Sequence, residues 1–189
     1  DQRETLEYLK AVAGASDLPI MIYNNPVDYG IEVTIDMFEE LLKIDTIQAV
    51  KESTRDVSNV TRLKNAFNDR LKILCGVDTL AMESLVMGAD GWVAGLVCAF
   101  PRETVVIYEL IRQDRLEEAR EIYRWFLPLL ELDINAKLVQ NIKLAEEATG
   151  IGSAFVRPPR LPLTGEELSQ VKRVITKGLA SRPDLKKYC

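Results

Sequence analysis

The sequence predicts an α/β fold built around a parallel sheet. Short apolar runs alternate with amphipathic stretches over residues 18–113, and polar or glycine residues follow each run. This alternation at such short spacing requires parallel strands joined by right-handed crossovers. Only helical patterns follow after residue 113. We therefore expect the second half of a (β/α)8 TIM barrel over residues 1–113, and a C-terminal helical extension over residues 114–189.

The first part of the chain contains four candidate strands with helices between them. The apolar runs that predict strands are residues 18–23, 46–50, 71–75 and 91–97. The first of these is wholly apolar, which is typical of a strand buried on both faces. Helical periodicity covers residues 3–13, 35–43, 55–67 and 79–87. Thr34, Ser53 and Asp78 precede the last three helices at positions from which their side chains can cap them.

The second part of the chain is predicted to be helical. Pro101 opens a helix at the first-turn position that proline tolerates. Further helices are expected over residues 115–131, 133–148 and 166–180. Asp114 with Glu117, and Thr164 with Glu167, have the spacing of capping boxes at the starts of the first and third. Three prolines within residues 157–162 exclude helix there.

The length of the chain leaves a second fold open. A complete barrel needs about 250 residues and eight strands, whereas this chain has 189 residues. It would therefore supply about the last four strands of a barrel. An open, doubly wound sheet needs only four or five strands, and the pattern alone does not separate the two folds. Because the helical pattern begins almost at Asp1, we expect more chain before it.

Composition narrows the possible functions. The chain is 47% hydrophobic and 28% charged with a net charge of −5, so we expect neither nucleic acid nor a membrane as partner. A cytoplasmic location is the default expectation. The chain contains no histidine, which excludes His-based triads and removes the commonest metal ligand. Cys75 and Cys98 lie in apolar surroundings, and we expect both to be buried.

Two strand ends carry the residues with chemical potential. In parallel α/β folds the active site lies at the carboxyl ends of the strands. Lys51 follows the second apolar run, where burial would favour the neutral amine that attacks a ketone. Tyr23 ends the first run, where a phenol can move a proton. Taken alone, each is explained better as a strand end, with the lysine reaching solvent or Glu52 and the tyrosine filling the rim.

Glycines follow the other two predicted strands. Gly76 after the third strand and Gly95 in the fourth would keep their loops low, which leaves room for a small ligand. Asp78 and Val93 lie next to these glycines and complete the set of candidate ligand contacts. Taken alone, single glycines at such places also fit simple turns.

Together these strand ends resemble the dihydrodipicolinate synthase / N-acetylneuraminate lyase family. The family's Tyr-Asn-x-Pro motif matches Tyr23-Asn24-Asn25-Pro26, and its Lys-Glu-[Ser/Ala] motif matches Lys51-Glu52-Ser53. Its Gly-x-Asp occurs at residues 76–78, and Gly-Ala-Asp-Gly occurs at residues 88–91. The resemblance extends over nearly the whole chain.

The resemblance implies a Schiff-base lyase and assigns roles to the candidate residues. Lys51 would form an imine with pyruvate or another 2-oxo acid, and Tyr23 would relay protons. The substrate would be bound by Gly76, Asp78, Val93 and Gly95. No cofactor or metal is implied, because the protonated imine itself serves as the electron sink. The family also implies a homo-oligomer, commonly a tetramer or a dimer, and we expect a homotetramer.

Two departures from the family pattern limit the expectation. The family's synthases have an arginine two residues after the motif's proline, where this chain has Asp28. We therefore expect a sugar-acid dehydratase, an aldolase or a deaminase rather than a true dihydrodipicolinate synthase. The family's Gly-Thr-Thr-Gly-Glu loop, which binds the substrate carboxylate, has no counterpart here. The chain on its own is therefore expected to lack part of the site and to be inactive.

Two other functional classes compete with this interpretation. A phosphate-binding TIM-barrel enzyme would use Gly76, Gly95 and a helix N-terminus, but would leave Lys51 and Tyr23 without roles. Alternatively, the chain is an inactive half-barrel that serves assembly only. The apolar faces of the helices after residue 102 would then be buried against a partner subunit.

Overall fold

The computed structural model describes residues 1–188 and separates into two compact units. The first unit comprises residues 1–93 and the second residues 94–189. The expected boundary between a barrel part (residues 1–113) and a helical extension (residues 114–189) stays a prediction. None of the helices formed by the described residues is both long enough and apolar enough to span a membrane.

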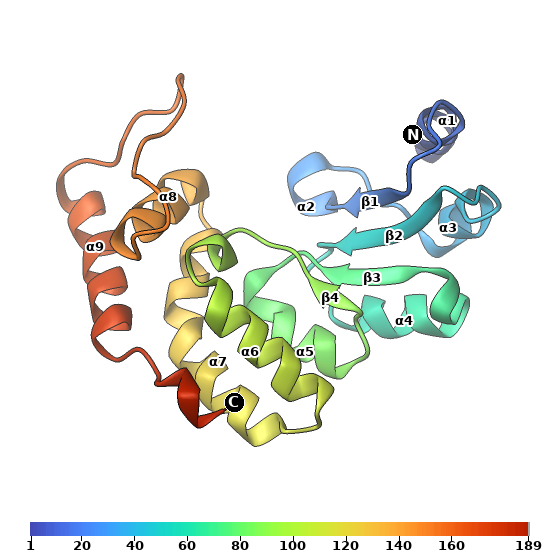
Figure 1. Ribbon diagram of the computed structural model, residues 1–189. Helices are drawn as coiled ribbons and strands as arrows, with labels where there is room; N and C mark the ends of the chain where they lie inside the picture. The colour runs from blue at the N-terminus through green and yellow to red at the C-terminus, as the bar shows by residue number, and fades with distance from the viewer. Residues whose placement is uncertain (189) are drawn as a thin grey trace. The chain divides into compact units, whose positions relative to one another are not determined.

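The first unit is a parallel sheet with helices between its strands. The strands are β1 (Ile20–Asn24), β2 (Ile47–Glu52), β3 (Lys72–Cys75) and β4 (Gly91–Trp92). The helices are α1 (Gln2–Gly14), α2 (Pro26–Tyr29), α3 (Ile35–Leu41), α4 (Ser58–Phe67) and α5 (Ala81–Val86). The strands pair in the sequential order β1-β2-β3-β4 (Figure 1). A doubly wound fold reverses its strand order, so the sequential order favours a barrel segment.

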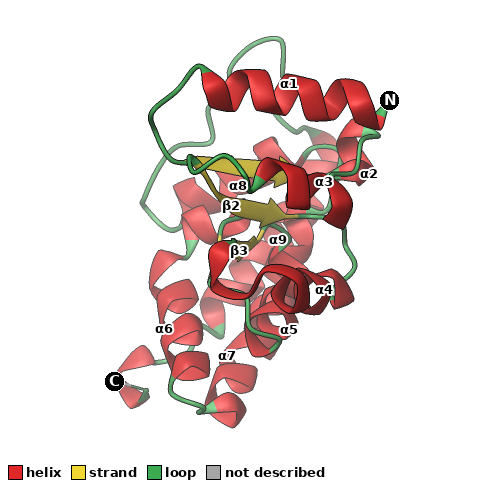
Figure 2. Ribbon diagram, turned by 90° about the vertical axis from the view of Figure 1, so that its right-hand side faces the viewer, coloured by secondary structure: helices red, strands yellow, loops and turns green. Residues whose placement is uncertain are grey.

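The register of the sheet sorts its side chains onto two faces. Parallel pairing aligns Tyr23 with Lys51, and Lys51 with Leu74, so these three side chains share one face. Right-handed crossovers place α3, α4 and α5 on the opposite face (Figure 2). That covered face carries the buried side chains Ile22, Val50 and Ile73.

Two strand predictions need correction. The strand expected over residues 91–97 pairs only at Gly91 and Trp92, and Leu96–Ala99 turns into a 3-10 helix instead. The run at residues 18–23 was expected to be buried on both faces, but Met21 and Tyr23 are exposed. The reason is that β1 is an edge strand, and its open face is not covered within this unit.

Two predicted helix caps in this unit are also wrong. Thr34 does cap α3 by accepting from the Met37 N–H at 3.4 Å. Ser53 caps nothing, because Arg55 has a positive φ of 65° and α4 starts only at Ser58. Asp78 begins a 3-10 helix and does not cap α5. Its carboxylate accepts a hydrogen bond from the Trp92 indole N–H instead. The short helix α2 was not predicted.

The second unit is helical. Its helices are α6 (Pro101–Arg112), α7 (Leu116–Leu130), α8 (Leu138–Ala148) and α9 (Gly165–Ala180). Helix α7 contacts both α6 and α9 (Figure 1). Phe100, Trp125 and Phe126 form an aromatic cluster with ring centroids 5.4–5.9 Å apart. The predicted helices over residues 115–131, 133–148 and 166–180 are thus confirmed, with starts that differ by one to five residues.

Both capping boxes predicted for this unit are wrong. Asp114 has a positive φ of 59°, and α7 begins beyond it without a side-chain cap. Thr164 does occupy the N-cap position of α9, but its side chain makes no capping hydrogen bond. The expectation for the cysteines is half right, since Cys75 is buried and Cys98 is exposed.

Candidate active site

Lys51 and Tyr23 lie side by side on the open face of the sheet. They are direct partners in the β1–β2 register, one residue before the carboxyl end of each strand. The Lys51 Nζ lies over the phenol ring, 4.3 Å from its centroid. Lys51 is half-buried, whereas 42% of Tyr23 is exposed. The amine is therefore accessible from the same side as the phenol.

A buried polar network fixes the two strand ends behind this pair. Glu52 accepts hydrogen bonds from the Asn59 side-chain amide at 2.9 Å and from the Thr54 N–H at 2.8 Å. The Asn24 amide donates to the same carboxylate at 3.4 Å. Asn24 also exchanges two hydrogen bonds with the backbone of Val33. Because Asn24 and Glu52 directly follow Tyr23 and Lys51, the network stabilises the register that pairs the phenol with the amine.

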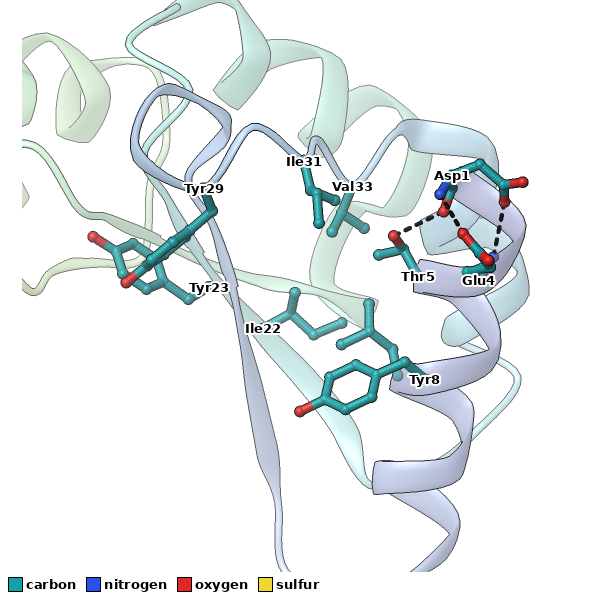
Figure 3. Close-up of a pocket in the computed structure, with 10 residues that line it drawn as sticks. Asp1, Glu4, Thr5, Tyr8, Ile22, Tyr23, Tyr29, Ile31 and Val33 are labelled. Atoms are coloured by element: carbon teal, nitrogen blue, oxygen red, sulfur yellow. Dashed lines mark hydrogen bonds and ion pairs between the residues drawn. The ribbon is translucent and has the colours of Figure 1, made fainter.

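The phenol of Tyr23 is held at its oxygen and at its ring. The Asn25 side-chain amide donates to the Tyr23 hydroxyl oxygen at 3.0 Å. The Tyr29 ring packs edge-on against the Tyr23 ring, with centroids 5.6 Å apart (Figure 3). Asn25 is the N-cap of α2 and Tyr29 is its last residue, so this short helix and its cap supply both contacts.

Gly76 makes space for the stem of the lysine. A methyl group at this position would come within 2.8 Å of Lys51 Cγ and Cε and would collide with the Ser53 hydroxyl. The space above Gly76 is thus filled by neighbouring side chains. The Ser53 hydroxyl is buried and, among the described residues, accepts or donates no hydrogen bond. It therefore offers a polar contact beside the lysine stem.

Asp78 and Val93 also belong to the first unit. Asp78 is buried and accepts a hydrogen bond from the Trp92 indole N–H at 2.9 Å. The Val93 N–H donates to the Cys75 carbonyl at 2.9 Å, which continues the β3–β4 pairing, and the Val93 side chain is exposed. Burial raises the pKa of the adjacent Cys75 thiol, so this cysteine stays protonated and packs as a small apolar residue.

Gly95 is the one predicted site residue that lies in the second unit. An added methyl group there would meet Ile142 Cδ1 at 2.8 Å and would collide with the Asp133 carboxylate. Gly95 therefore permits close packing within the second unit. Its contact with a substrate stays a prediction.

An apolar groove of about 460 Å³ lies beside Tyr23 in the first unit (Figure 3). Its lining comes from α1, from the edge strand β1 and from the loop after α2, and includes Tyr8, Ile22, Tyr29 and Val33. Lys51 is not among the lining residues. The groove therefore flanks the proton-relay candidate on one side only, and the amine faces the open side of the sheet.

Sequence reasoning missed the residues that hold the reactive pair. Asn25 occupies the variable position of the Tyr-Asn-x-Pro motif, so the motif gives no reason to select it. Glu52 and Asn24 are within the motifs, but their partnership depends on the strand register. The one available signal was an acidic residue, Glu52, at the end of an apolar strand, where a carboxylate is expensive to bury without hydrogen-bond donors. Among residues 1–188, no three acidic or cysteine side chains form a cluster suited to a metal ion.

Sequential parallel strands with an amine and a phenol at their carboxyl ends define a segment of an α/β barrel enzyme scaffold. The sequence profile of the Dihydrodipicolinate synthetase family matches residues 1–178. The chain belongs to this family.

Individual relatives agree with the family match. The chain is 28% identical over 178 residues to 4-hydroxy-tetrahydrodipicolinate synthase of Methanothrix thermoacetophila, covering 94% of this chain and 60% of the relative. It is 27% identical over 174 residues to N-acetylneuraminate lyase of Clostridium perfringens, covering 92% and 60%. The structure of the 4-hydroxy-tetrahydrodipicolinate synthase from Methylacidiphilum fumariolicum SolV superposes with a TM-score of 0.88 at 27% identity, covering 100% and 62%. The chain thus spans about three fifths of the length of these proteins.

Proposed function

We propose that this protein is a Schiff-base-forming lyase that acts on pyruvate or another 2-oxo acid. Lys51 forms the imine and Tyr23 moves protons beside it. The observation that carries the proposal is the strand register, which places the Lys51 amine 4.3 Å from the centroid of the Tyr23 ring on the open face of the sheet. The family supports the same class, since its members include a synthase and a lyase.

The chemistry follows from an amine beside a phenol. The neutral Lys51 amine attacks the 2-oxo carbon, and the resulting carbinolamine loses its hydroxyl as water when Tyr23 supplies a proton. The carbon–nitrogen double bond that forms carries a positive charge and withdraws electrons from the adjacent carbon. A bond at that carbon can then break or form, and hydrolysis returns the free amine. The protonated imine is the electron sink, so no cofactor is part of this scheme.

Asp28 supports a narrower substrate assignment. It occupies the position at which the family's synthases have an arginine, and its carboxylate is held at 2.7 Å by the Asn25 amide. A fixed negative charge disfavours a second substrate carboxylate near Tyr23. We therefore assign the protein to the sugar-acid dehydratases, aldolases or deaminases of the family rather than to its true synthases.

The remaining parts of the proposal rest on the family resemblance. Gly76, Asp78, Val93 and Gly95 are assigned to substrate binding. The protein is proposed to be a cytoplasmic homo-oligomer, with a tetramer as the expected assembly. Activity is assigned to the natural protein, since this chain spans only part of its relatives.

Borohydride trapping tests the proposal. The natural protein, and this chain beside it, are incubated with pyruvate and sodium borohydride, and peptide masses locate the reduced adduct. We expect an adduct on Lys51 that disappears in Lys51→Arg, because the guanidinium keeps the charge but is not a nucleophile. Lys72→Arg is the matched control, since Lys72 pairs with Asp90 and should leave trapping unchanged.

The outcomes separate the competing functions. An adduct in the natural protein but not in this chain supports the function and shows that the rest of the protein completes the site. A folded natural protein that forms no adduct with pyruvate or with larger 2-oxo acids overturns the proposal. Stabilisation by phosphate in that case would favour a phosphate-binding enzyme, and a merely assembled, unreactive protein would favour an assembly role.

A further inference from the structure

The Asn25 side chain hydrogen-bonds through both of its amide hydrogens and through its amide oxygen to residues close to it in the sequence. It is 4% exposed and is not part of the reactive pair. Its amide nitrogen donates to the Tyr23 hydroxyl oxygen at 3.0 Å and to the Asp28 carboxylate at 2.7 Å. Its amide oxygen accepts from the Asp28 N–H at 3.3 Å. Two donors and one acceptor are therefore all engaged.

The orientation of this amide follows from its partners. The Asp28 carboxylate, when ionised, can only accept, and the Asp28 N–H can only donate. The nitrogen of Asn25 must therefore face the carboxylate, and its oxygen must face the backbone. The second hydrogen on that nitrogen is then directed at Tyr23. The phenol oxygen consequently receives a hydrogen bond, and its own hydrogen is left for a different acceptor.

We propose that Asn25 is a positioning residue that prepares Tyr23 for proton transfer in the imine-forming reaction. This inference rests on the proposed function. By occupying the phenol oxygen as donor, Asn25 keeps the hydroxyl hydrogen directed away from itself. When Tyr23 gives that proton to the departing hydroxyl of the carbinolamine, the same N–H stabilises the negative charge left on the phenol oxygen. Asp28 holds the Asn25 amide in the orientation that directs this N–H at the Tyr23 hydroxyl.

A purely structural role for Asn25 makes a different prediction. As the N-cap of α2 it accepts from the Asp28 N–H, and this contact alone would justify an asparagine. Serine keeps the capping oxygen but is too short to reach the Tyr23 hydroxyl. Asn25→Ser therefore removes the donor while it retains the cap. Its effect must pass through the Tyr23 hydroxyl if the inference is correct.

A double-mutant cycle with Tyr23→Phe tests this in the natural protein. The readout is the exchange of pyruvate methyl protons for deuterium in D2O, followed by proton NMR, because exchange at that carbon requires the imine. We expect Asn25→Ser to slow exchange about tenfold when Tyr23 is present, the loss of one hydrogen bond to a developing charge. In the Tyr23→Phe background we expect less than about a twofold effect.

Each outcome is decisive. An equal slowing in both backgrounds, or no slowing in either, overturns the role of Asn25 while the proposed function stands. If the natural protein catalyses no exchange that depends on Lys51, the proposed function fails and this inference falls with it. The rate of borohydride trapping at Lys51 closes the same cycle when exchange in the Tyr23→Phe background is too slow to follow. Circular dichroism of each variant verifies the fold.

Discussion

At the scale of single residues, the placement of the Lys51 amine depends on Gly76, a position that has no side chain. The stem of Lys51 passes over Gly76, where an added methyl group would come within 2.8 Å of Lys51 Cγ and Cε, and this restricts where the amine can lie. Lysine has four rotatable bonds, so this contact matters more than it would for a stiffer side chain. The sheet register supplies the position of the Cα atom, and Gly76 supplies the path of the stem.

Gly76→Ala should therefore damage chemistry more than stability. The added methyl group would displace the Lys51 stem from its place over the Tyr23 ring, and a misplacement of about 1 Å can cost up to about a hundredfold in rate. Overpacking should lower the free energy of unfolding by about 1–3 kcal/mol. Borohydride trapping rates and urea unfolding measure the two effects. Gly14→Ala, where a methyl group meets no atom within 4 Å, is the control; trapping by Gly76→Ala at the wild-type rate would contradict the prediction.

Sequence reasoning selected Lys51 and Tyr23 as the candidate reactive residues, but it did not select the residues that hold them in place. The sequence pattern alone was enough to select Lys51 and Tyr23, because each lies at the end of an apolar run. A polar side chain at the end of a predicted buried strand stands out from the residues before it. The roles of Asn25 and Glu52 require knowledge of which strands are neighbours and in what register. No local pattern carries that information, because the Glu52 network joins residues up to 28 positions apart.

At the scale of secondary structure, Asp90 fastens the short strand β4 to β3. Its carboxylate accepts from the Ile73 N–H at 2.9 Å and from Lys64 at 2.8 Å, and its own N–H donates to the Ile73 carbonyl. Burial raises the pKa of Asp90, but the hydrogen bonds from Ile73, Lys64 and Lys72 outweigh it, so the pKa lies below its ordinary value. Asp90, the aspartate of the Gly-Ala-Asp-Gly motif, therefore stabilises the β3–β4 pairing.

Asp90→Asn should destabilise the protein in a pH-dependent way. We expect a loss of about 1–2 kcal/mol at neutral pH, because hydrogen bonds to a charged acceptor are weakened. Since the pKa is lower in the folded than in the unfolded state, the stabilisation is full above the ordinary value of about 4 and is lost as the pH falls through the folded value. Urea unfolding from neutral pH down to about pH 3 should show wild type and variant converging. A constant difference at all pH values would contradict this.

Two helix starts, those of α4 and α7, were misplaced for a shared reason. Arg55 and Asp114 adopt positive φ angles although neither is a glycine, and each lies just before a helix whose start was placed too early. A left-handed conformation at a non-glycine residue has no strong sequence signal. Helical periodicity, by contrast, follows from burial of one face, and the bodies of α1, α3 and α7 were predicted correctly for that reason.

At the scale of the whole molecule, each unit is stabilised by contacts among its own residues. In the second unit, Glu103 is 1% exposed and pairs with Arg182, which also lies over the Phe100 ring. The hydrogen bond to Glu103 raises the pKa of Arg182 beyond its ordinary value. This pair joins the start of α6 to the segment after α9.

Glu103→Ala should destabilise the second unit selectively. It removes the buried acceptor of the Arg182 hydrogen bonds, and because the arginine left behind is exposed to solvent we expect the cost of losing hydrogen bonds to a charged group, about 1.5–3 kcal/mol. In a Trp92→Phe background, Trp125 fluorescence reports on the second unit alone, because these are the two tryptophans of the chain. Glu166→Ala removes an exposed pair with Arg173 and should change little. Equal effects of the two alanine variants would argue against a special role for Glu103.

The choice between a barrel segment and a doubly wound sheet also belongs to this scale. Both folds use the same local alternation of strand and helix, so composition and periodicity could not separate them. The sequential strand order and the superposition on a family structure with a TM-score of 0.88 do so.

The pairing of Tyr23 with Lys51 across neighbouring strands has a consequence for biosynthesis. Both residues belong to one β-α-β unit, so a single short crossover brings them together. The entropy cost of closing a loop grows only slowly with its length, so this crossover adds little to the cost of pairing the two strands. During translation the β1–β2 pairing is therefore available once β2 has left the ribosome, and the path of the Lys51 stem is set when Gly76 follows, before the helices of the second unit have been made.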